Sequence, residues 1–437
     1  MRLEGKSLKS DFLKFIVPSM IAQIVYSLYS MVDGMFVAKG VNETALAAIN
    51  ISMPFLMFLF SIALVFSVGS STIIAIFIGE GKTKKANEMY TQNIITIIVL
   101  SLIITGIVVA FNDQIALFLG ATEGTIGYVK TYITTISIFA AFFVCSYSFE
   151  VLIKTDGFPA LATVFVISGV VMNCILDYIF VILLNKGVFG AAFATGISQI
   201  IVIALYVSHF ASKRTHMNLC KFTFDKGALL RTLKIGMASG ITEFSPGIVI
   251  FLFNHAILTY IGEDAIVSYT IIAYASSIVM YAITGVAQGI QPLVSYHYGG
   301  GRYESCKKLL RYALIFSVGV SIVAFALTKI FAEPVVSIFI SSDLTSLREY
   351  SVYALGIFII SYSVMWVNIV VGGYLTAIER AKSSIVISLG RGLIFVAISL
   401  FVLTKIMGGD GIWWAAFATE AMCLFVSIIL LKMVKYE

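Results

Sequence analysis

Long apolar runs separated by short polar breaks dominate the hydrophobic pattern of this chain. Each run has about 20 or more residues, which is enough for a helix to cross a hydrocarbon core of roughly 30 Å. Several runs exceed that length, so we expect tilted helices or helices that extend into water. Reading the runs against the charged breaks predicts twelve helices, near 12–38, 46–78, 90–111, 124–153, 158–184, 188–211, 235–260, 264–297, 309–330, 346–377, 383–404 and 412–432.

The composition supports a location in the bilayer. Of the 437 residues, 59% are hydrophobic and 12% are charged. A soluble domain carries about 25% charged residues, so half that density cannot cover a water-facing surface. The five cysteines form no CxxC pair and most lie within apolar runs, so we expect packed thiols rather than a disulfide framework or a zinc site. The charged N-terminus leads into an apolar run too long for a signal peptide, which predicts an uncleaved first span.

Lysine and arginine gather in alternate breaks of the pattern. The N-terminus, the loop near Lys82, the stretch from Lys213 to Lys234 and the C-terminus share one side of the predicted topology. Cytoplasmic loops of membrane proteins carry such an excess of positive charge, which predicts that both termini are cytoplasmic. The net charge of +6 follows from this topology, so we expect no nucleic-acid partner.

The two halves of the chain match when one is shifted by about 220 residues. Gly79-Glu-Gly-Lys recurs as Gly299-Gly-Gly-Arg, and Ala191-Ala-Phe-Ala-Thr recurs as Ala415-Ala-Phe-Ala-Thr. Several matches in one order indicate an internal duplication. They predict an N-terminal six-helix lobe over 1–213, a cytoplasmic linker over 214–234 and a C-terminal lobe over 235–437.

Six helices per half give both halves the same orientation in the membrane. Repeats of this kind are related by an axis along the membrane normal, and transport sites tend to lie between them. The sequence lacks a GxxxxGK[ST] phosphate loop and a repeated selectivity filter. The pattern therefore predicts a secondary transporter in which two lobes alternate access to a central site.

Polar residues at similar depth in three predicted spans form the first candidate site. Asp33, Asp177 with Asn173 one turn earlier, and Thr195 with Ala191 one turn earlier all fall roughly 8–11 Å below the outer boundary. A carboxylate inside a membrane costs at least about 2.5–3.5 kcal/mol, which marks such groups as functional candidates. Two neighbouring carboxylates cannot easily both stay ionised, so the group suits a proton or a small cation. The alternative is that both aspartates reach the outer interface.

Weaker candidates concern the substrate. Glu243 in the seventh span has the charge to attract a cationic substrate, although a structural hydrogen bond explains it equally well. Gln288 lies in the eighth span, and Tyr29, Tyr147 and Tyr269 are aromatic residues suited to a cavity for flat cations. With 21 Tyr and 34 Phe in the chain, most aromatic side chains must nevertheless serve packing or face lipid.

Three further ionisable residues lie within spans. Arg391 is expected to pair with a carboxylate such as Glu379 or to reach the cytoplasmic interface. Glu420 has no role that the pattern assigns. His255 is isolated, and a lone histidine of this kind is more often a packed polar residue than a ligand.

Several of these residues stand in motifs that together resemble the multidrug and toxic compound extrusion (MATE) family, in particular its bacterial DinF-like branch. The resemblance covers essentially the whole chain, and the motifs are specific in combination and order. They are Pro18 with Tyr29-Ser-Met-Val-Asp33, Asn42-Glu-Thr-Ala-Leu-Ala-Ala-Ile, Asn173-Cys-Ile-Leu-Asp177 and Gly289-Ile-Gln-Pro-Leu-Val-Ser-Tyr-His-Tyr-Gly299.

The resemblance implies an all-α, twelve-helix membrane fold of two homologous lobes that exchanges drugs for protons or sodium ions. It maps the family's N-lobe cation or sodium site onto Asp33, Asn173, Asp177 and Thr195, with Ala191 as a carbonyl donor. It also implies that protonation of the helix-one aspartate bends that helix at its proline, here Pro18. The C-terminal lobe departs from the pattern, because a shift of 222 residues places Phe395 and Ser399 opposite the Asn173–Asp177 pair.

We therefore expect a multidrug exporter of amphipathic organic cations, a monomer in the bacterial plasma membrane that contacts lipids and needs no cofactor beyond its coupling ion. The same oxygen ligands serve a proton or sodium, so the sequence does not choose between them. A related flippase for a lipid-linked precursor or peptide would favour a more basic cavity. A membrane-embedded enzyme would need a catalytic cluster, which the sequence does not contain, and a channel is the most distant alternative.

Overall fold

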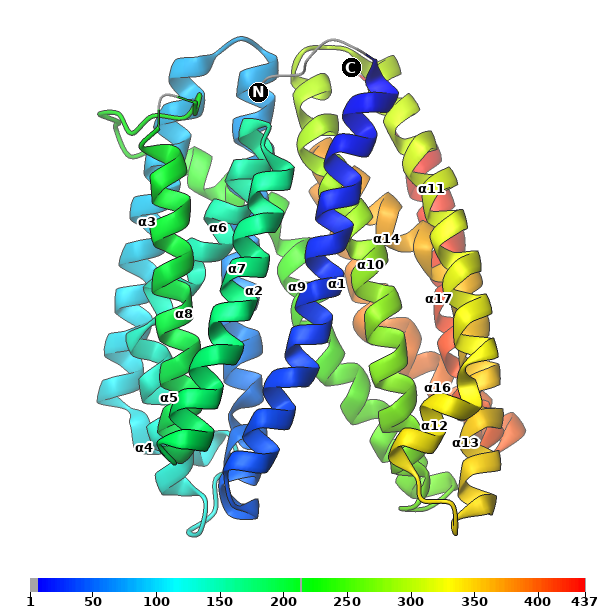
Figure 1. The fold of residues 1–437 in the computed structure, drawn as a ribbon. Helices are drawn as coiled ribbons and strands as arrows, with labels where there is room; N and C mark the ends of the chain where they lie inside the picture. Colours follow the sequence, from blue (N-terminus) through cyan, green and yellow to red (C-terminus); the bar gives the residue numbers. More distant parts are fainter. Residues whose placement is uncertain (1–6, 213, 437) are drawn as a thin grey trace.

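The computed structural model describes residues 7–212 and 214–436 and is built from helices throughout this part (Figure 1). The first half contains α1 Leu8–Gly40, α2 Glu43–Gly79, α3 Thr83–Ala110, α4 Asn112–Phe118, α5 Ile126–Ile138, α6 Ala140–Asp156, α7 Pro159–Asp177, the π turn η1 Tyr178–Leu183 and α8 Gly187–Phe210. The second half contains α9 Lys226–Tyr260, α10 Ala265–Gly299, α11 Tyr303–Ile330, α12 Ala332–Phe339, α13 Thr345–Phe358, the 3-10 turn η2 Ile359–Ser361, α14 Tyr362–Ala377, α15 Ala381–Leu389, the π turn η3 Gly390–Ile394, α16 Phe395–Met407 and α17 Asp410–Lys432.

The helices confirm the predicted membrane architecture. In the described residues, eleven helical stretches are long and apolar enough to cross a bilayer, and the pair α5–α6, bent by 52°, makes a twelfth if it is counted as one span. Most ends agree with the predicted ranges, but α3, α9 and α11 begin clearly earlier, at Thr83, Lys226 and Tyr303. Helix α9 begins at Lys226, about nine residues before the predicted start, because its first turns are polar and continue beyond the apolar run.

The two halves repeat each other in their turns as well as in their helices. Gly81 and Gly301, at corresponding positions after α2 and α10, both adopt a left-handed conformation with φ of +76° and +68°. Gly157 after α6 has φ of +103°, and its counterpart after α14 is Glu379 with φ of +60°. Glycine enters this region without the steric penalty that a Cβ brings, so Glu379 holds a strained version of the same turn.

Helices α1 and α9 each cross from one lobe to the other along their length (Figure 1). Phe15 and Ile16 of α1 are buried in the hydrophobic core of the second half, whereas Val37 lies in a core of the first half. The pattern is reversed in α9, where Ile235 packs into the first half and Phe253 into the second. Near their starts, α1 and α9 therefore fasten the two lobes together.

The lobes approach most closely near the end of the molecule that carries both termini (Figure 1). A Cβ added to Gly236 of α9 would meet the Val65 backbone carbonyl of α2, and one added to Gly285 of α10 would meet the backbone of Met20 in α1. Toward the opposite end the helices of the two lobes diverge (Figure 1). The structure is therefore closed at the end that carries the termini.

The segment that joins the two lobes is tied to the first half. Backbone N–H groups of Asn218, Cys220 and Asp225 donate to side chains of α3, at 3.1 Å, 3.1 Å and 2.9 Å. The Asp225 side chain also caps α9 by accepting from its first N–H groups. This connection fixes the start of α9 beside α3.

Candidate functional site

Three helices of the first half bring the predicted ion-binding residues together. Asp33 comes from α1, Asn173 and Asp177 come from one face of α7, and Thr195 comes from α8. Asp177 is fully buried, Asn173 is 2% exposed and Asp33 is partly buried. A cluster of this polarity inside an apolar lobe requires its groups to satisfy one another.

Asn173 links the members of this cluster. In the amide orientation that satisfies both of its ends, the NH2 group donates to the Tyr29 hydroxyl at 2.8 Å and to Asp177 Oδ2 at 2.7 Å. Its oxygen then accepts from the Thr195 backbone N–H at 3.2 Å. The Thr195 hydroxyl donates to the Ala191 carbonyl at 2.9 Å. The Ala191 carbonyl, which the resemblance implies as an ion ligand, thus accepts one hydrogen bond and keeps a second lone pair.

The carboxyl groups of Asp33 and Asp177 face each other within hydrogen-bonding reach. Asp177 Oδ1 is buried, and no N–H or hydroxyl group in the described part of the chain donates to it. Two ionised carboxylates are both acceptors and repel each other, so this contact requires a shared proton or a bound cation. The Asp33–Asp177 pair is therefore the part of the site that lacks a donor or a cation among the described residues.

The backbone of α7 is irregular where the cluster forms. The α-helix ends at Asp177 and continues as the π turn η1, which runs from Tyr178 to Leu183. Single π turns widen a helix locally and are frequent at functional sites. Here the widened turn begins directly after the carboxylate that faces α1.

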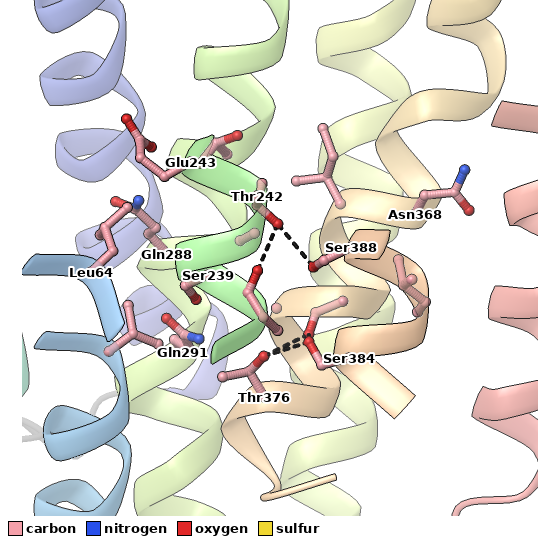
Figure 2. A pocket seen from close by; sticks show the side chains of 18 of the residues that line it. Leu64, Ser239, Thr242, Glu243, Gln288, Gln291, Asn368, Thr376, Ser384 and Ser388 are labelled. Atoms are coloured by element: carbon pink, nitrogen blue, oxygen red, sulfur yellow. Dashed lines mark hydrogen bonds between the residues drawn. The ribbon is translucent and has the colours of Figure 1, made fainter. Parts of the chain in front are cut away.

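A second group of polar residues lies between the lobes (Figure 2). Glu243 of α9 and Gln288 of α10 line two adjoining cavities, one of about 90 Å³ and one of about 30 Å³. Gln288 accepts a hydrogen bond from Gln23 of α1 at 2.9 Å. Figure 2 shows Glu243 and Gln288 near Leu64 of α2, so both halves contribute to this site.

Tyr147 lines the smaller of these cavities, and its hydroxyl donates to Tyr26 of α1. The other two tyrosines proposed for a substrate cavity lie elsewhere. Tyr29 belongs to the Asp33–Asp177 cluster through Asn173, and Tyr269 lies in a separate cavity of the second half, where it stacks on Phe253 at 4.9 Å.

Pro18 lies in α1 where that helix passes between α7 and α10. Its carbonyl accepts a hydrogen bond from the Thr163 hydroxyl of α7 at 2.8 Å. On the other side, a Cβ at Gly289 of α10 would come within 3.0 Å of Ile16. Because proline has no N–H to close its turn, the helix is weakest at a point that both neighbours contact.

The expected partner of Arg391 was wrong. Its guanidinium group donates to Glu420, from Nε at 3.0 Å and from Nη2 at 2.7 Å, while Glu379 pairs with Arg231 of α9. Arg391 stands in the π turn η3 and lines the same cavity as Glu420 of α17, so it reaches this carboxylate instead of Glu379. His255 is also not packed: it is exposed on α9, where it stacks on Phe251.

Sequence reasoning missed a charged pair beside the inter-lobe cavities. Glu150 lines the smaller cavity and accepts from Lys154, one turn later in α6, at 2.6 Å; Lys154 is 1% exposed. The i, i+4 spacing of opposite charges within an apolar run was the available signal. Tyr281 of α10, which faces Tyr26, had no such signal.

The cation ligands present are oxygen groups. Within residues 7–212 and 214–436, no group of three or more His, Cys, Asp or Glu side chains is placed to hold a metal ion. The Asp33–Asp177 cluster offers two carboxylates, the hydroxyl groups of Tyr29 and Thr195 and one amide, a set of hard ligands that suits a proton or an alkali cation.

Comparisons with known proteins show the family and the fold of the chain. A family model described as MatE matches residues 18–179 and 241–407, once in each half. Multidrug export protein MepA of Staphylococcus haemolyticus is 25% identical over 433 residues, which cover 98% of this chain and 94% of the relative. Its counterpart in Staphylococcus aureus (strain NCTC 8325) is 23% identical over 427 residues and 96% and 93% of the two chains.

Solved structures share the fold. An outward-facing multidrug resistance MATE family transporter of the MOP superfamily superposes with a TM-score of 0.92 at 22% identity, covering 98% of this chain and 95% of the other. A MOP superfamily transporter from Pyrococcus furiosus superposes with a TM-score of 0.91, also at 22% identity and with the same coverage.

Proposed function

Because the chain belongs to the MatE family of multidrug efflux transporters, we propose that it exports amphipathic organic cations in exchange for protons or sodium ions. The family is one of transporters rather than enzymes, and its members are multi-pass proteins of the cell membrane. The observation that carries the proposal is the contact between the carboxyl groups of Asp33 and Asp177, which is stable only with a proton or cation between them.

This contact links ion binding to the position of a whole helix. Asp33 is on α1, whereas Asp177 is on α7, so a bound ion holds the two helices together and its loss leaves two like charges facing each other. A ligand changes a conformational equilibrium only when it binds the two states with different affinity. A site shared between α1 and α7 has that property, because its geometry changes whenever α1 moves relative to α7.

The hydrogen bonds of Asn173 suit a proton. In the amide orientation that satisfies both of its ends, its NH2 group faces Asp177. An N–H donor next to a protonated carboxyl pair is well placed, whereas a sodium ion would need the amide oxygen to turn toward it. A proton also needs no coordination shell of five or six oxygens, and one lone pair of the Ala191 carbonyl already accepts from Thr195.

Glu243 and the tyrosines around it supply the features that an organic cation requires. Glu243 accepts no hydrogen bond from any described residue and lines both inter-lobe cavities. Tyr147, Tyr26 and Tyr281 surround the same region, and aromatic faces attract organic cations. The proposed substrate therefore binds between the lobes, while the ion binds within the first lobe.

Transport in inside-out membrane vesicles tests the proposal. Wild-type protein is expected to accumulate ethidium in the vesicle lumen when a proton or sodium gradient is imposed. Asp33→Asn should abolish this gradient-driven accumulation, because one member of the carboxyl pair is lost. Asp264→Asn makes the same chemical change at an exposed position and should leave accumulation unaltered. Undiminished accumulation by Asp33→Asn would reject the proposed coupling site.

A further inference from the structure

The second half repeats the threonine turn of the ion site but has no carboxylates at the positions of Asp33 and Asp177. Thr419 of α17 repeats Thr195, and its hydroxyl donates to the Ala415 carbonyl at 2.7 Å as Thr195 does to Ala191. Where the first half has Asp177, the second half has Ser399, whose hydroxyl accepts from Thr419 at 3.2 Å. The threonine turn is thus repeated, but Thr195 contacts Asn173 in the first half and Thr419 contacts Ser399 in the second, where the position of Asp177 carries no charge.

A buried carboxylate nevertheless stands next to the repeated threonine. Glu420 follows Thr419 in α17, and its two oxygens accept three hydrogen bonds from Arg391, at 2.7 Å to 3.0 Å. Asn368 of α14 donates to the same carboxylate at 2.7 Å, and the Ser427 hydroxyl donates to the Asn368 oxygen at 2.9 Å. The side chains of Arg391 and Glu420 are 14% and 10% exposed.

The two lobes therefore differ in the group that neutralises a buried carboxylate. In the first half two carboxyl groups share a site that is incomplete without a mobile cation. In the second half the carboxylate is already saturated by a guanidinium group, which stays charged at all physiological pH values. A proton or sodium ion would have to displace a bidentate pair to reach Glu420.

Resting on the proposed function, we infer that Arg391 is a tethered cation: it neutralises the buried carboxylate of Glu420, which follows the repeated threonine, so that Glu420 takes up no coupling ion. Coupling is then confined to Asp33 and Asp177. Replacing Arg391 by a neutral residue would leave Glu420 buried without a counter-charge, and the carboxylate would then bind a proton or a sodium ion.

The surroundings allow a small cation to reach Glu420 once the guanidinium is removed. Arg391 and Glu420 both line a cavity of about 240 Å³ between α9, α10, α14 and α17. The other titratable groups around this pair are Cys423 on α17, Tyr269 on α10 and Tyr362 on α14. Glu243 on α9 lines the neighbouring cavity together with Arg391, so the test must separate its response from that of Glu420.

The tryptophans of the chain provide a local signal. All three, Trp366, Trp413 and Trp414, lie on α14 and α17, the helices that carry Asn368 and Glu420. Tryptophan fluorescence of the purified protein is measured during titration with sodium chloride at several pH values, against choline chloride at equal ionic strength. No gradient or drug is required, so the outcome is independent of whether Asp33 couples transport.

Arg391→Gln is expected to show an additional saturable response to sodium or protons, beyond the one that binding at Asp33 and Asp177 gives in wild-type protein. The double variant Arg391→Gln/Glu420→Gln should lose this response, which assigns it to Glu420 rather than Glu243. Arg391→Lys keeps a tethered charge and should resemble wild type. The inference is overturned if Arg391→Gln and the double variant respond alike.

A second measurement does not depend on the stability of Arg391→Gln. In Asp33→Asn protein the first lobe has lost its carboxyl pair, and Glu420 of the second lobe is still paired with Arg391. We therefore expect this variant to show no saturable fluorescence response to sodium. A response of Asp33→Asn protein that disappears when Arg391 and Glu420 are both replaced by Gln would show that Glu420 exchanges its cation, and would contradict the inference.

Discussion

Asp177 and Glu420 are both buried carboxylates, and their different partners give them different roles. Asp177 faces a second carboxyl group, so the pair needs a proton or a cation between its members, which we propose to be the coupling ion. Glu420 faces Arg391 and is neutralised within the chain. Breaking a buried pair costs about 3–5 kcal/mol, so the second arrangement is fixed while the first is exchangeable.

The residue that orders the exchangeable pair is Asn173, and Tyr29 is the partner that can be removed most cleanly. Tyr29→Phe keeps the ring but leaves one N–H of Asn173 without an acceptor. A buried unsatisfied donor costs about 1–3 kcal/mol, so we expect a lower midpoint of thermal unfolding and a weaker response of transport to the ion gradient. Tyr128→Phe is the control, because its hydroxyl only meets Asn42 at 3.5 Å on the surface. Equal unfolding midpoints for the two variants would contradict this role.

The sequence predicted which site residues lie together when they share one depth in the membrane. Asp33, Asn173, Asp177 and Thr195 share one depth, and helices of known direction bring equal depths together. The partner of Arg391 could not be found in this way, because Glu420 and Glu379 differ in helix rotation, which one sequence does not fix. The π turn in which Arg391 stands has no sequence signature that we could use.

At the scale of elements, α1 combines three features that suit a moving helix. It carries Asp33, it contains Pro18, and it passes from the core of the second lobe into the first. Helix α9 repeats the crossing and contains Pro246 between its two packed segments. Each crossing helix thus has a weak point between the part that holds one lobe and the part that holds the other.

Pro18→Ala tests whether transport requires α1 to bend at this proline. Restoring a helical hydrogen bond should stabilise α1 by up to about 3 kcal/mol and stiffen it. We expect ethidium transport to slow by about tenfold or more, a barrier increase of about 1.4 kcal/mol, while ethidium binding is retained. Pro159→Ala, at the first turn of α7 where proline does not interrupt a hydrogen bond, serves as control. Unchanged transport by Pro18→Ala would show that α1 moves without bending there.

The spans themselves were predictable because a bilayer demands long apolar helices. The short helices α4 and α12 were not, since their seven and eight residues include an acidic residue in the first turn that marks the end of a longer apolar run. The bend of 52° between α5 and α6 was also missed. No proline marks it, and periodicity does not register a change of direction.

At the scale of the whole molecule, glycine contacts close one end. Gly236 and Gly240 of α9 touch α2, and Gly79 of α2 touches α10 near Tyr296, in each case too closely for a Cβ. With the termini in the cytoplasm, as the charge pattern predicts, this closed end faces inward and the substrate region faces outward. Opening inward must separate these backbone surfaces.

Gly236→Ala should therefore favour the state that is open at the end with the termini. Its Cβ would overlap the Val65 carbonyl, and such overpacking costs about 1–3 kcal/mol in the closed state. A cysteine introduced as Ser239→Cys, in the neighbouring cavity, should then react faster with a membrane-impermeant maleimide added from that side. Gly106→Ala, where nothing lies within 4 Å of the new Cβ, should not change the reaction rate. Equal rates would contradict the proposed closure.

The duplicated frame was visible in the sequence, because the same turn and the same Ala-Ala-Phe-Ala-Thr segment recur. The crossing of α1 and α9 was not visible. Contacts between lobes join residues far apart in the sequence, such as Ser61 with Gly240 and Gln23 with Gln288, which are 179 and 265 positions apart, and they belong to one conformational state rather than to the fold as such. A hydrophobic pattern indicates which face of a helix is buried but does not identify its neighbour.

The central claim, that drug movement is exchanged for ion movement at Asp33 and Asp177, is tested most directly by measuring the ion. Inside-out vesicles containing a lumenal pH indicator receive ethidium with no gradient imposed. Wild-type protein should carry ethidium inward and protons outward, so that the lumen becomes alkaline; sodium coupling would instead appear as loss of ²²Na⁺ from preloaded vesicles. Asp33→Asn and Asp177→Asn should show neither flux, and Asp264→Asn should match wild type. Ethidium-driven proton or sodium movement at the wild-type rate in Asp33→Asn would contradict the account.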